Sequence, residues 1–337
     1  MIDTIQFTPS IPIPVDLDLL NSFQLRFPKK QGGERFTETS KYIYRTRTWN
    51  FAMIGLRLES TGHSSITKIE CDLPKLLYGH NGRLIHNQAE LSEAIRRIGA
   101  LLHHFTLWPA GSDGSSHPID LGPVSRIDLV WQYNIPVTTI RNLLQNCRVE
   151  GINKNPSIHD GKNIVIPGTY LGVKAYDKIH ECGGKASPSS ATNACRFEFR
   201  LVEVERIAKA FGLKPGEQLK FPEFDQSYSV YRTLMGRIDN VTPAASAGAG
   251  AGGIARFLAE EAIKDPWIIS RYLESRQLRS SSASRVRQRV RAVAKKLRQF
   301  DLRSLIPPGQ PPAAVDVVCS SKEKIFQDFL TQNPDLF

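Results

Sequence analysis

The chain has 337 residues, 41% of them hydrophobic, which is enough for a sizeable core and about two domains. Lys and Arg outnumber Asp and Glu by 44 to 33, and the resulting net charge of +11 favours a polyanionic partner. We expect no membrane location, because no segment approaches the ~20 apolar residues of a span and the N-terminus lacks a signal pattern. The five cysteines contain no paired CxxC, which fits a reducing cytoplasm.

Short runs of β-forming residues and helical segments follow one another without regular alternation. The patterns predict strands over 51–59, 66–73, 124–133 and 194–202, helices over 88–105 and 137–147, a hairpin from 163–166 and 170–179, and a helix ending near Gly212. No Rossmann or P-loop glycine pattern occurs. This order predicts an α+β fold with a mainly antiparallel sheet and helices packed on it.

The clearest change in composition is the Gly- and Ala-rich segment 242–253, which predicts a linker. It separates a domain over 1–241 from a basic helical region over 254–306. Prolines at 307–312 mark a second boundary before a C-terminal tail with a short helix, 307–337.

Charged residues occupy three predicted strands where a buried strand prefers apolar side chains, at 125–128, 175–178 and 196–200. Alternation along the last of these puts its charged residues on one face and its two phenylalanines on the other. If the phenylalanines fill the core, Glu198 faces a groove where Asp128 of another strand can meet it.

Two carboxylates on one face repel each other unless a cation joins them, and hard oxygen ligands suit Mg²⁺ or Mn²⁺ with a phosphate substrate. A tyrosine such as Tyr176 would then attack the phosphate, with Lys178 lowering the tyrosine pKa or offsetting phosphate charge. The ordinary alternative is that Arg126–Asp128 and Arg196–Glu198 are ion pairs on the sheet surface, and that Tyr176 is a core aromatic.

Five short motifs occur in one order along the chain. They are Met1-Ile2-Asp3, Ile69-Glu70-Cys71-Asp72-Leu73-Pro74-Lys75-Leu76-Leu77-Tyr78-Gly79-His80-Asn81, Ser125-Arg126-Ile127-Asp128, the Ala-Tyr-x-Lys segment at 175–178, and Arg196-Phe197-Glu198-x-Arg200. In this order the chain resembles the replication-initiation proteins of filamentous bacteriophages and their plasmid relatives. The resemblance covers residues 1 to about 210, and the C-terminal third is similar only in general character.

The resemblance implies a rolling-circle initiator, with domain 1–241 as the nicking and joining domain. Such proteins are metal-dependent endonucleases that nick one strand at the double-strand origin, remain joined to its 5′ end through a tyrosine, and later rejoin the ends. It implies origin duplex and single-stranded DNA, a host helicase and a host polymerase as partners, and a homo-oligomer at the origin. The location is then the bacterial host cytoplasm.

The attacking tyrosine of that family corresponds to Tyr176, and Tyr170 is its rival because Tyr170-Leu171-Gly172 resembles the Tyr-x-Gly pattern of related plasmid initiators. Asp128 and Glu198 are the first candidates for Mg²⁺ or Mn²⁺, followed by Glu70 and His80. No His-x-His pair, the metal signature of other tyrosine nickases, is present. His80 has an alternative role in a turn capped through its neighbour Asn81.

Residues 284–300 predict a helix with an apolar stripe and a strongly basic opposite face. We expect that face to contact DNA phosphates, together with the arginines of the sheet motifs. The predicted DNA-binding residues are Arg126, Arg196, Arg200, Arg285, Arg287, Arg289, Arg291, Lys295, Lys296 and Arg298.

Two other functions remain open from the sequence. The chain could be a non-catalytic origin-binding or repressor protein of the same phage or plasmid family. A phosphoryl-transfer enzyme for small substrates is the third possibility, and it would need a deep nucleotide-sized pocket.

Overall fold

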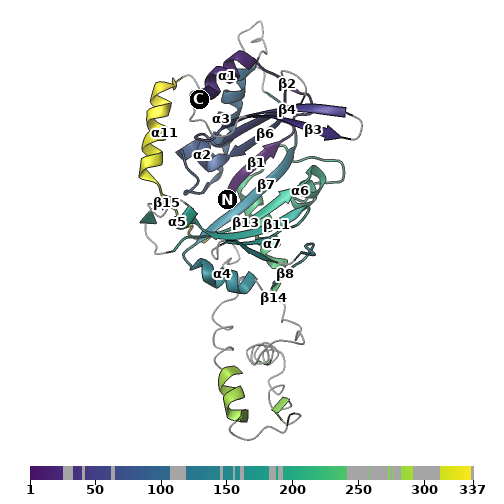
Figure 1. Ribbon diagram of the computed structural model, residues 1–337, viewed down its shortest axis with the longest axis vertical. Coiled ribbons are helices and arrows are strands. Elements are labelled where there is room, and N and C mark those ends of the chain that lie inside the picture. Colours follow the sequence, from purple (N-terminus) through teal and green to yellow (C-terminus); the bar gives the residue numbers. More distant parts are fainter. Residues whose placement is uncertain are drawn as a thin grey trace. The chain divides into compact units, whose positions relative to one another are not determined.

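The computed structural model has an α+β fold built on one large antiparallel sheet, as the sequence predicts (Figure 1). It describes residues 1–25, 33–39, 42–61, 65–106, 119–144, 147–154, 156–159, 163–181, 187–188, 193–240, 258, 272–273, 276, 282–290 and 312–334.

Ten strands follow one another across the main sheet, and an eleventh, β2 (Ile13–Pro14), pairs with β6. In spatial order the ten are β3 (Gly33–Thr39), β4 (Tyr42–Phe51), β5 (Leu56–Thr61), β6 (Ser65–Asp72), β1 (Ile2–Phe7), β7 (Val124–Tyr133), β13 (Cys195–Val202), β11 (Leu171–Asp177), β10 (Asn163–Ile166) and β9 (Ser157–His159). Strand β1 is antiparallel to both β6 and β7, so these two run parallel on either side of it. Helices α2 (Leu73–Tyr78) and α3 (Gln88–Phe105) lie between them in the chain, which makes a split β-α-β arrangement.

The apolar face of the sheet forms the core. On β13, Phe197 and Phe199 point to this face, and helix α7 (Phe224–Gly236) packs there with the Tyr231 ring centred 5.3 Å from that of Phe199. Rings from α1 (Leu17–Leu25), β4 and α3 meet in a second cluster, in which Phe23 lies 5.0 Å from Phe105. Helices on this face leave the charged side chains on the opposite face of the central strands.

The shorter elements are α4 (Val137–Leu144), α5 (Lys178–Glu181), α6 (Val204–Ala210), α11 (Ser320–Gln332), and the paired strands β12 (Ser187–Pro188) with β15 (Val317–Val318) and β14 (Ile238–Asn240) with β8 (Cys147–Val149). The chain divides into two compact units. The first contains residues 1–141, 151–233 and 313–337, and the second contains 142–150 and 234–312. Most of the predicted tail therefore belongs to the unit that carries the sheet.

One predicted strand is wrong. Residues 51–59 do not form a single strand, because β4 ends at Phe51 and β5 begins at Leu56 after a tight turn. Gly55 makes that turn with φ 67°, and a Cβ there would lie 2.8 Å from the Cβ of Asp72. Only glycine satisfies both conditions, so this apolar run encodes a hairpin.

Within the described residues, no helix is both long and apolar enough to cross a membrane. Three of the cysteines, Cys71, Cys195 and Cys319, are buried free thiols. The predicted linker 242–253 lies outside the described residues, as does most of 254–306.

Candidate active site

Strand register places the predicted catalytic residues on the polar face of the sheet. Tyr176 of β11 lies opposite Arg196 of β13, and Arg200 of β13 lies opposite Asp128 of β7. Because side chains alternate along a strand, Tyr176, Glu198 and Asp128 share this face. The sequence motifs, far apart in the chain, are thus brought together on three adjacent strands.

Asp128 is 2% exposed and accepts hydrogen bonds from two guanidinium groups. Nε and Nη2 of Arg126 lie 3.1 and 2.5 Å from Oδ1 and Oδ2, and both corresponding distances from Arg200 are 3.1 Å. Paired donors of this kind match both oxygens of a carboxylate. The predicted Arg126–Asp128 ion pair is present, and Arg200 makes a second ion pair with the same carboxylate.

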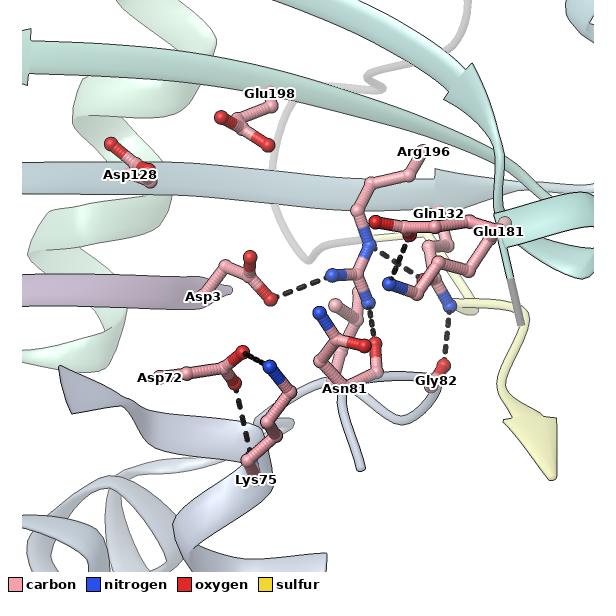
Figure 2. A network of polar contacts seen from close by, with 12 residues as sticks. Asp3, Asp72, Lys75, Asn81, Gly82, Asp128, Gln132, Glu181, Arg196 and Glu198 are labelled. Carbon is pink, nitrogen blue, oxygen red and sulfur yellow. Dashed lines mark hydrogen bonds and ion pairs between the residues drawn. The ribbon is translucent and has the colours of Figure 1, made fainter. Parts of the chain in front are cut away.

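Glu198 lies beside this group and contacts it weakly, with Arg200 Nη2 3.3 Å from its Oε1. Burial, and then the negative charge of Asp128, raise the pKa of Glu198 to about 7, although Lys174 and Arg200 act in the opposite direction. The raised pKa means that Glu198 keeps its proton up to near neutral pH, because two buried carboxyl groups lie close together. Figure 2 shows Glu198 and Asp128 on neighbouring strands, to the left of Arg196.

This pair of carboxylates fits a divalent cation in donor type. Mg²⁺ is commonly held by one or two carboxylates, with water and substrate phosphate completing its shell, so a full cage of protein ligands is not needed. Glu70 is the next carboxylate, 3.3 Å from Nη1 of Arg126. Within the described part of the chain, no group of three or more His, Cys, Asp and Glu side chains is arranged so that it could hold a metal ion by itself.

The partners of His80 are other groups than these carboxylates. It is 1% exposed, its Nδ1 accepts the N–H of Gly82 at 3.0 Å, and its Nε2 lies 2.8 Å from Oε1 of Glu323 in α11. Both ring nitrogens therefore have protein partners, which agrees with the role in a turn. Burial lowers the pKa of His80, against the raising effect of Glu323.

Tyr176 is 3% exposed, and burial raises its pKa well above the ordinary value of 10. Lys178 Nζ lies 5.6 Å from the Tyr176 ring centre, but it is itself buried and pairs with Glu181 at 2.6 Å. The sequence predicts that Lys178 lowers the Tyr176 pKa; the shift in the structure has the opposite sign because desolvation of the phenolate dominates.

Arg196 is fully buried and holds the end of the polar face together. Its guanidinium donates to Asp3 Oδ1 at 2.6 Å, to Gln132 Oε1 at 2.7 Å and to the Asn81 carbonyl (Figure 2). The sequence predicts a DNA contact for Arg196 or, as the ordinary alternative, an ion pair with Glu198 on the sheet surface. In the structure its partners lie within the protein, so we assign it a structural role.

Tyr170 has a different environment. It lies in the bend just before β11, its carbonyl accepts the N–H of Val202 at 2.9 Å, and its side chain is 46% exposed. The guanidinium of Arg206, in α6, lies 4.9 Å from the centre of its ring. Tyr170 is therefore the accessible tyrosine of the two candidates.

The predicted basic helix is described only over residues 282–290. There Arg285, Arg287 and Arg289 are exposed, and Val290 is buried, as expected for a helix with a basic outer face. Arg291, Lys295, Lys296 and Arg298 lie outside the described residues.

Sequence reasoning missed several residues that build the site. Asp3 and Gln132 are buried partners of Arg196, and Arg206 stands over Tyr170. Asp3 lies inside an apolar strand, which is a signal for a buried ion pair, but its partner is 193 residues away. Gln132 and Arg206 carry no comparable signal.

A scan against protein-family models and a search of curated proteins each find no match to this chain.

Proposed function

We propose that the chain is a DNA-nicking and strand-joining enzyme that starts rolling-circle replication in the cytoplasm of a bacterial host. The observation that carries the proposal is that Tyr176, Asp128, Glu198 and Arg200 share one face of three adjacent strands. The second tyrosine candidate, Tyr170, lies in the bend just before one of these strands. A net charge of +11 and the exposed arginines at 285–289 support DNA as the substrate.

Exposure favours Tyr170 over Tyr176 as the nucleophile, the reverse of the order predicted from the sequence. The side chain of Tyr176 is 3% exposed, whereas that of Tyr170 is 46% exposed and open to solvent. Burial also raises the pKa of Tyr176, which makes ionisation of its phenol unfavourable. The resemblance of Tyr170-Leu171-Gly172 to the Tyr-x-Gly pattern of plasmid initiators also favours Tyr170.

The chemistry is an exchange of two phosphoester bonds. The tyrosine oxygen bonds to phosphorus and its proton passes to solvent, while the bond from phosphorus to the 3′ oxygen breaks and that oxygen takes up a proton. The 5′ end stays on the protein until a 3′-hydroxyl attacks and reverses the exchange. Asp128 and Glu198 would hold Mg²⁺ or Mn²⁺, whose chemistry is to polarise the scissile phosphate.

Arg200 is placed to connect substrate with carboxylates. Its side chain is 46% exposed, and it pairs with Asp128 and Glu198 beneath it. A phosphate that attracts this guanidinium would free carboxylate oxygens for a cation, so that the site forms only with DNA present.

The test uses single-stranded oligonucleotides of random sequence labelled at the 3′ end, with Mg²⁺. If the protein keeps the 5′ end of the cut strand, the label stays on the protein in a denaturing gel. We expect Tyr170→Phe to abolish the labelled band, while Tyr176→Phe and the control Tyr228→Phe, on the apolar face, retain it. Loss in Tyr176→Phe alone would restore the order predicted from the sequence.

A non-catalytic origin-binding protein is the second candidate, and one observation favours it. Both oxygens of Asp128 are already paired with arginines, which neutralise it without a metal. Salt-dependent DNA binding by the wild-type chain without any labelled band would support this candidate and contradict the enzyme.

A further inference from the structure

We infer that Arg206 is a positioning residue, which holds the ring of Tyr170 in one orientation beside the end of β13. This inference rests on the proposed function, in which Tyr170 is the nucleophile. The structure shows the guanidinium of Arg206 4.9 Å from the centre of that ring, a distance typical of a cation–π contact.

The backbone on both sides of this contact is fixed. The carbonyl of Tyr170 accepts the N–H of Val202, the last residue of β13, at 2.9 Å. The next residue, Glu203, donates its N–H to the carbonyl of Ser125 at 3.0 Å. Tyr170 and the start of α6 are therefore both attached to the same strand end, and only side-chain torsions remain to be set.

Glu203 makes the turn from β13 into α6 with a strained backbone. Its φ of 82° makes it the one non-glycine residue with positive φ in the described part of the chain. This turn brings Arg206, in the first turn of α6, over Tyr170, and the Glu203 carboxylate lies 3.9 Å from Nε of Arg206. The same residue thus bends the chain and pairs with the guanidinium.

The exposed side-chain contacts of this arrangement contribute little to stability. The side chains of Glu203, Arg206 and Tyr170 are each more than 40% exposed. An exposed ion pair or cation–π contact stabilises the fold by less than the strained backbone of Glu203 destabilises it. A cation in the first turn is also at the unfavourable end of the helix dipole. Strain that local contacts do not offset is concentrated at functional sites.

Ring position matters for the proposed chemistry because attack requires the phenol oxygen in line with the phosphorus. A small misplacement of a reacting group lowers the rate by a large factor without weakening substrate binding. Loss of Arg206 should therefore lower the rate of adduct formation at saturating oligonucleotide, and change the dissociation constant little.

The test compares Arg206→Gln with Arg206→Lys, which keeps a cation, and with Lys209→Gln, an exposed residue on the same helix. The first readout is ¹⁹F NMR of protein containing 3-fluorotyrosine, with the Tyr170 signal identified by its loss in Tyr170→Phe. We expect Arg206→Gln to shift this signal towards that of free fluorotyrosine, and Lys209→Gln to leave it in place. An unchanged signal in Arg206→Gln, or an equal shift in Lys209→Gln, would overturn the inference.

The second readout is single-turnover adduct formation. Arg206→Gln should slow it about tenfold at saturating oligonucleotide, with partial rescue in Arg206→Lys. Equal rates for wild type and Arg206→Gln would overturn a role in the reaction. Failure of the wild-type chain to form any adduct would instead contradict the proposed function, and the NMR readout would still decide whether Arg206 orients Tyr170.

Discussion

At the scale of single residues, the polar face separates into a buried end and an accessible end. Arg196, Asp3 and Gln132 form a closed network at one end, and Arg200 reaches solvent at the other. Tyr170 is exposed in the bend beside the last residue of β13. Burial is the largest influence on the pKa of Asp3 and would raise it, but the positive charges of Arg196, Lys178, Lys75 and the N-terminus together lower the pKa. We therefore assign the buried end a role in stability, and the proposed chemistry belongs to the accessible end.

Replacing Arg196 should test the structural role. Arg196→Ala leaves Asp3 buried without its cation, so we expect the free energy of unfolding to fall by about 3–5 kcal/mol. The control Arg96→Ala removes an exposed ion pair with Glu93 and should cost at most about 1 kcal/mol. Urea denaturation measures both, and equal effects would contradict the assignment.

Glu198 should make stability depend on pH. Its folded pKa is about 7 and the ordinary value is 4.5, so the folded state binds the proton more tightly, and stability falls as the pH rises from 4.5 to 7. Glu198→Gln removes this term. We expect the stability of the variant, relative to wild type, to increase by an amount on the order of 2 kcal/mol between pH 4.5 and 8.

The same denaturation experiment tests whether Glu198 and Asp128 bind Mg²⁺. Mg²⁺ held by Glu198 and Asp128 would favour the ionised carboxyl and flatten the pH dependence of wild-type stability. Denaturation curves at several pH values, with and without Mg²⁺, give the slopes. A relative stability of Glu198→Gln that is independent of pH would contradict the raised pKa.

At the scale of elements, periodicity predicts the long segments well. The helix 88–105 and the strand 124–133 are predicted with the bounds that α3 and β7 have. The prediction of one strand over 51–59 is wrong because apolar residues continue through a turn, and Gly55 is its only signal in the sequence. The shared face of Asp128 and Glu198 follows from alternation, but strand order and burial depend on tertiary packing, which sequence periodicity does not contain.

Helix α11 offers a matched test of packing. Gly79 and Gly212 both have positive φ, but a Cβ at Gly79 would lie 2.3 Å from the Cβ of Phe326 in α11, whereas a Cβ at Gly212 would meet nothing within 4 Å. We expect Gly79→Ala to cost about 1–3 kcal/mol more than Gly212→Ala in urea denaturation, because it displaces α11 in addition to straining the backbone. Equal costs would mean that α11 does not pack on Gly79.

At the scale of the whole molecule, the chain leaves the first compact unit and returns to it. Residues 313–337 belong with the sheet, where Asp316 binds the N–H of Leu84 at 3.1 Å and Glu323 binds His80. The sequence could not predict this return, since these contacts join residues more than 230 positions apart. The second unit contributes the exposed arginines at 285–289.

Those arginines should set part of the salt dependence of DNA binding. Replacing Arg285, Arg287 and Arg289 with Gln should reduce the slope of log K against log salt on duplex DNA by about 2–3, since each phosphate contact contributes about 0.9. Exposed Arg96, Lys209 and Arg232, replaced together, serve as the control with equal loss of charge. Equal reductions would indicate a general effect of net charge.

The most direct test of the central claim is to identify the tyrosine that carries DNA. Trypsin cuts after Lys162, Lys174 and Lys178, so it separates Tyr170 on peptide 163–174 from Tyr176 on peptide 175–178. After the wild-type adduct is digested with nuclease and trypsin, mass spectrometry should find the residual nucleotide on peptide 163–174. A nucleotide on peptide 175–178 would contradict Tyr170 as the nucleophile, and no modified peptide at all would contradict the nicking enzyme.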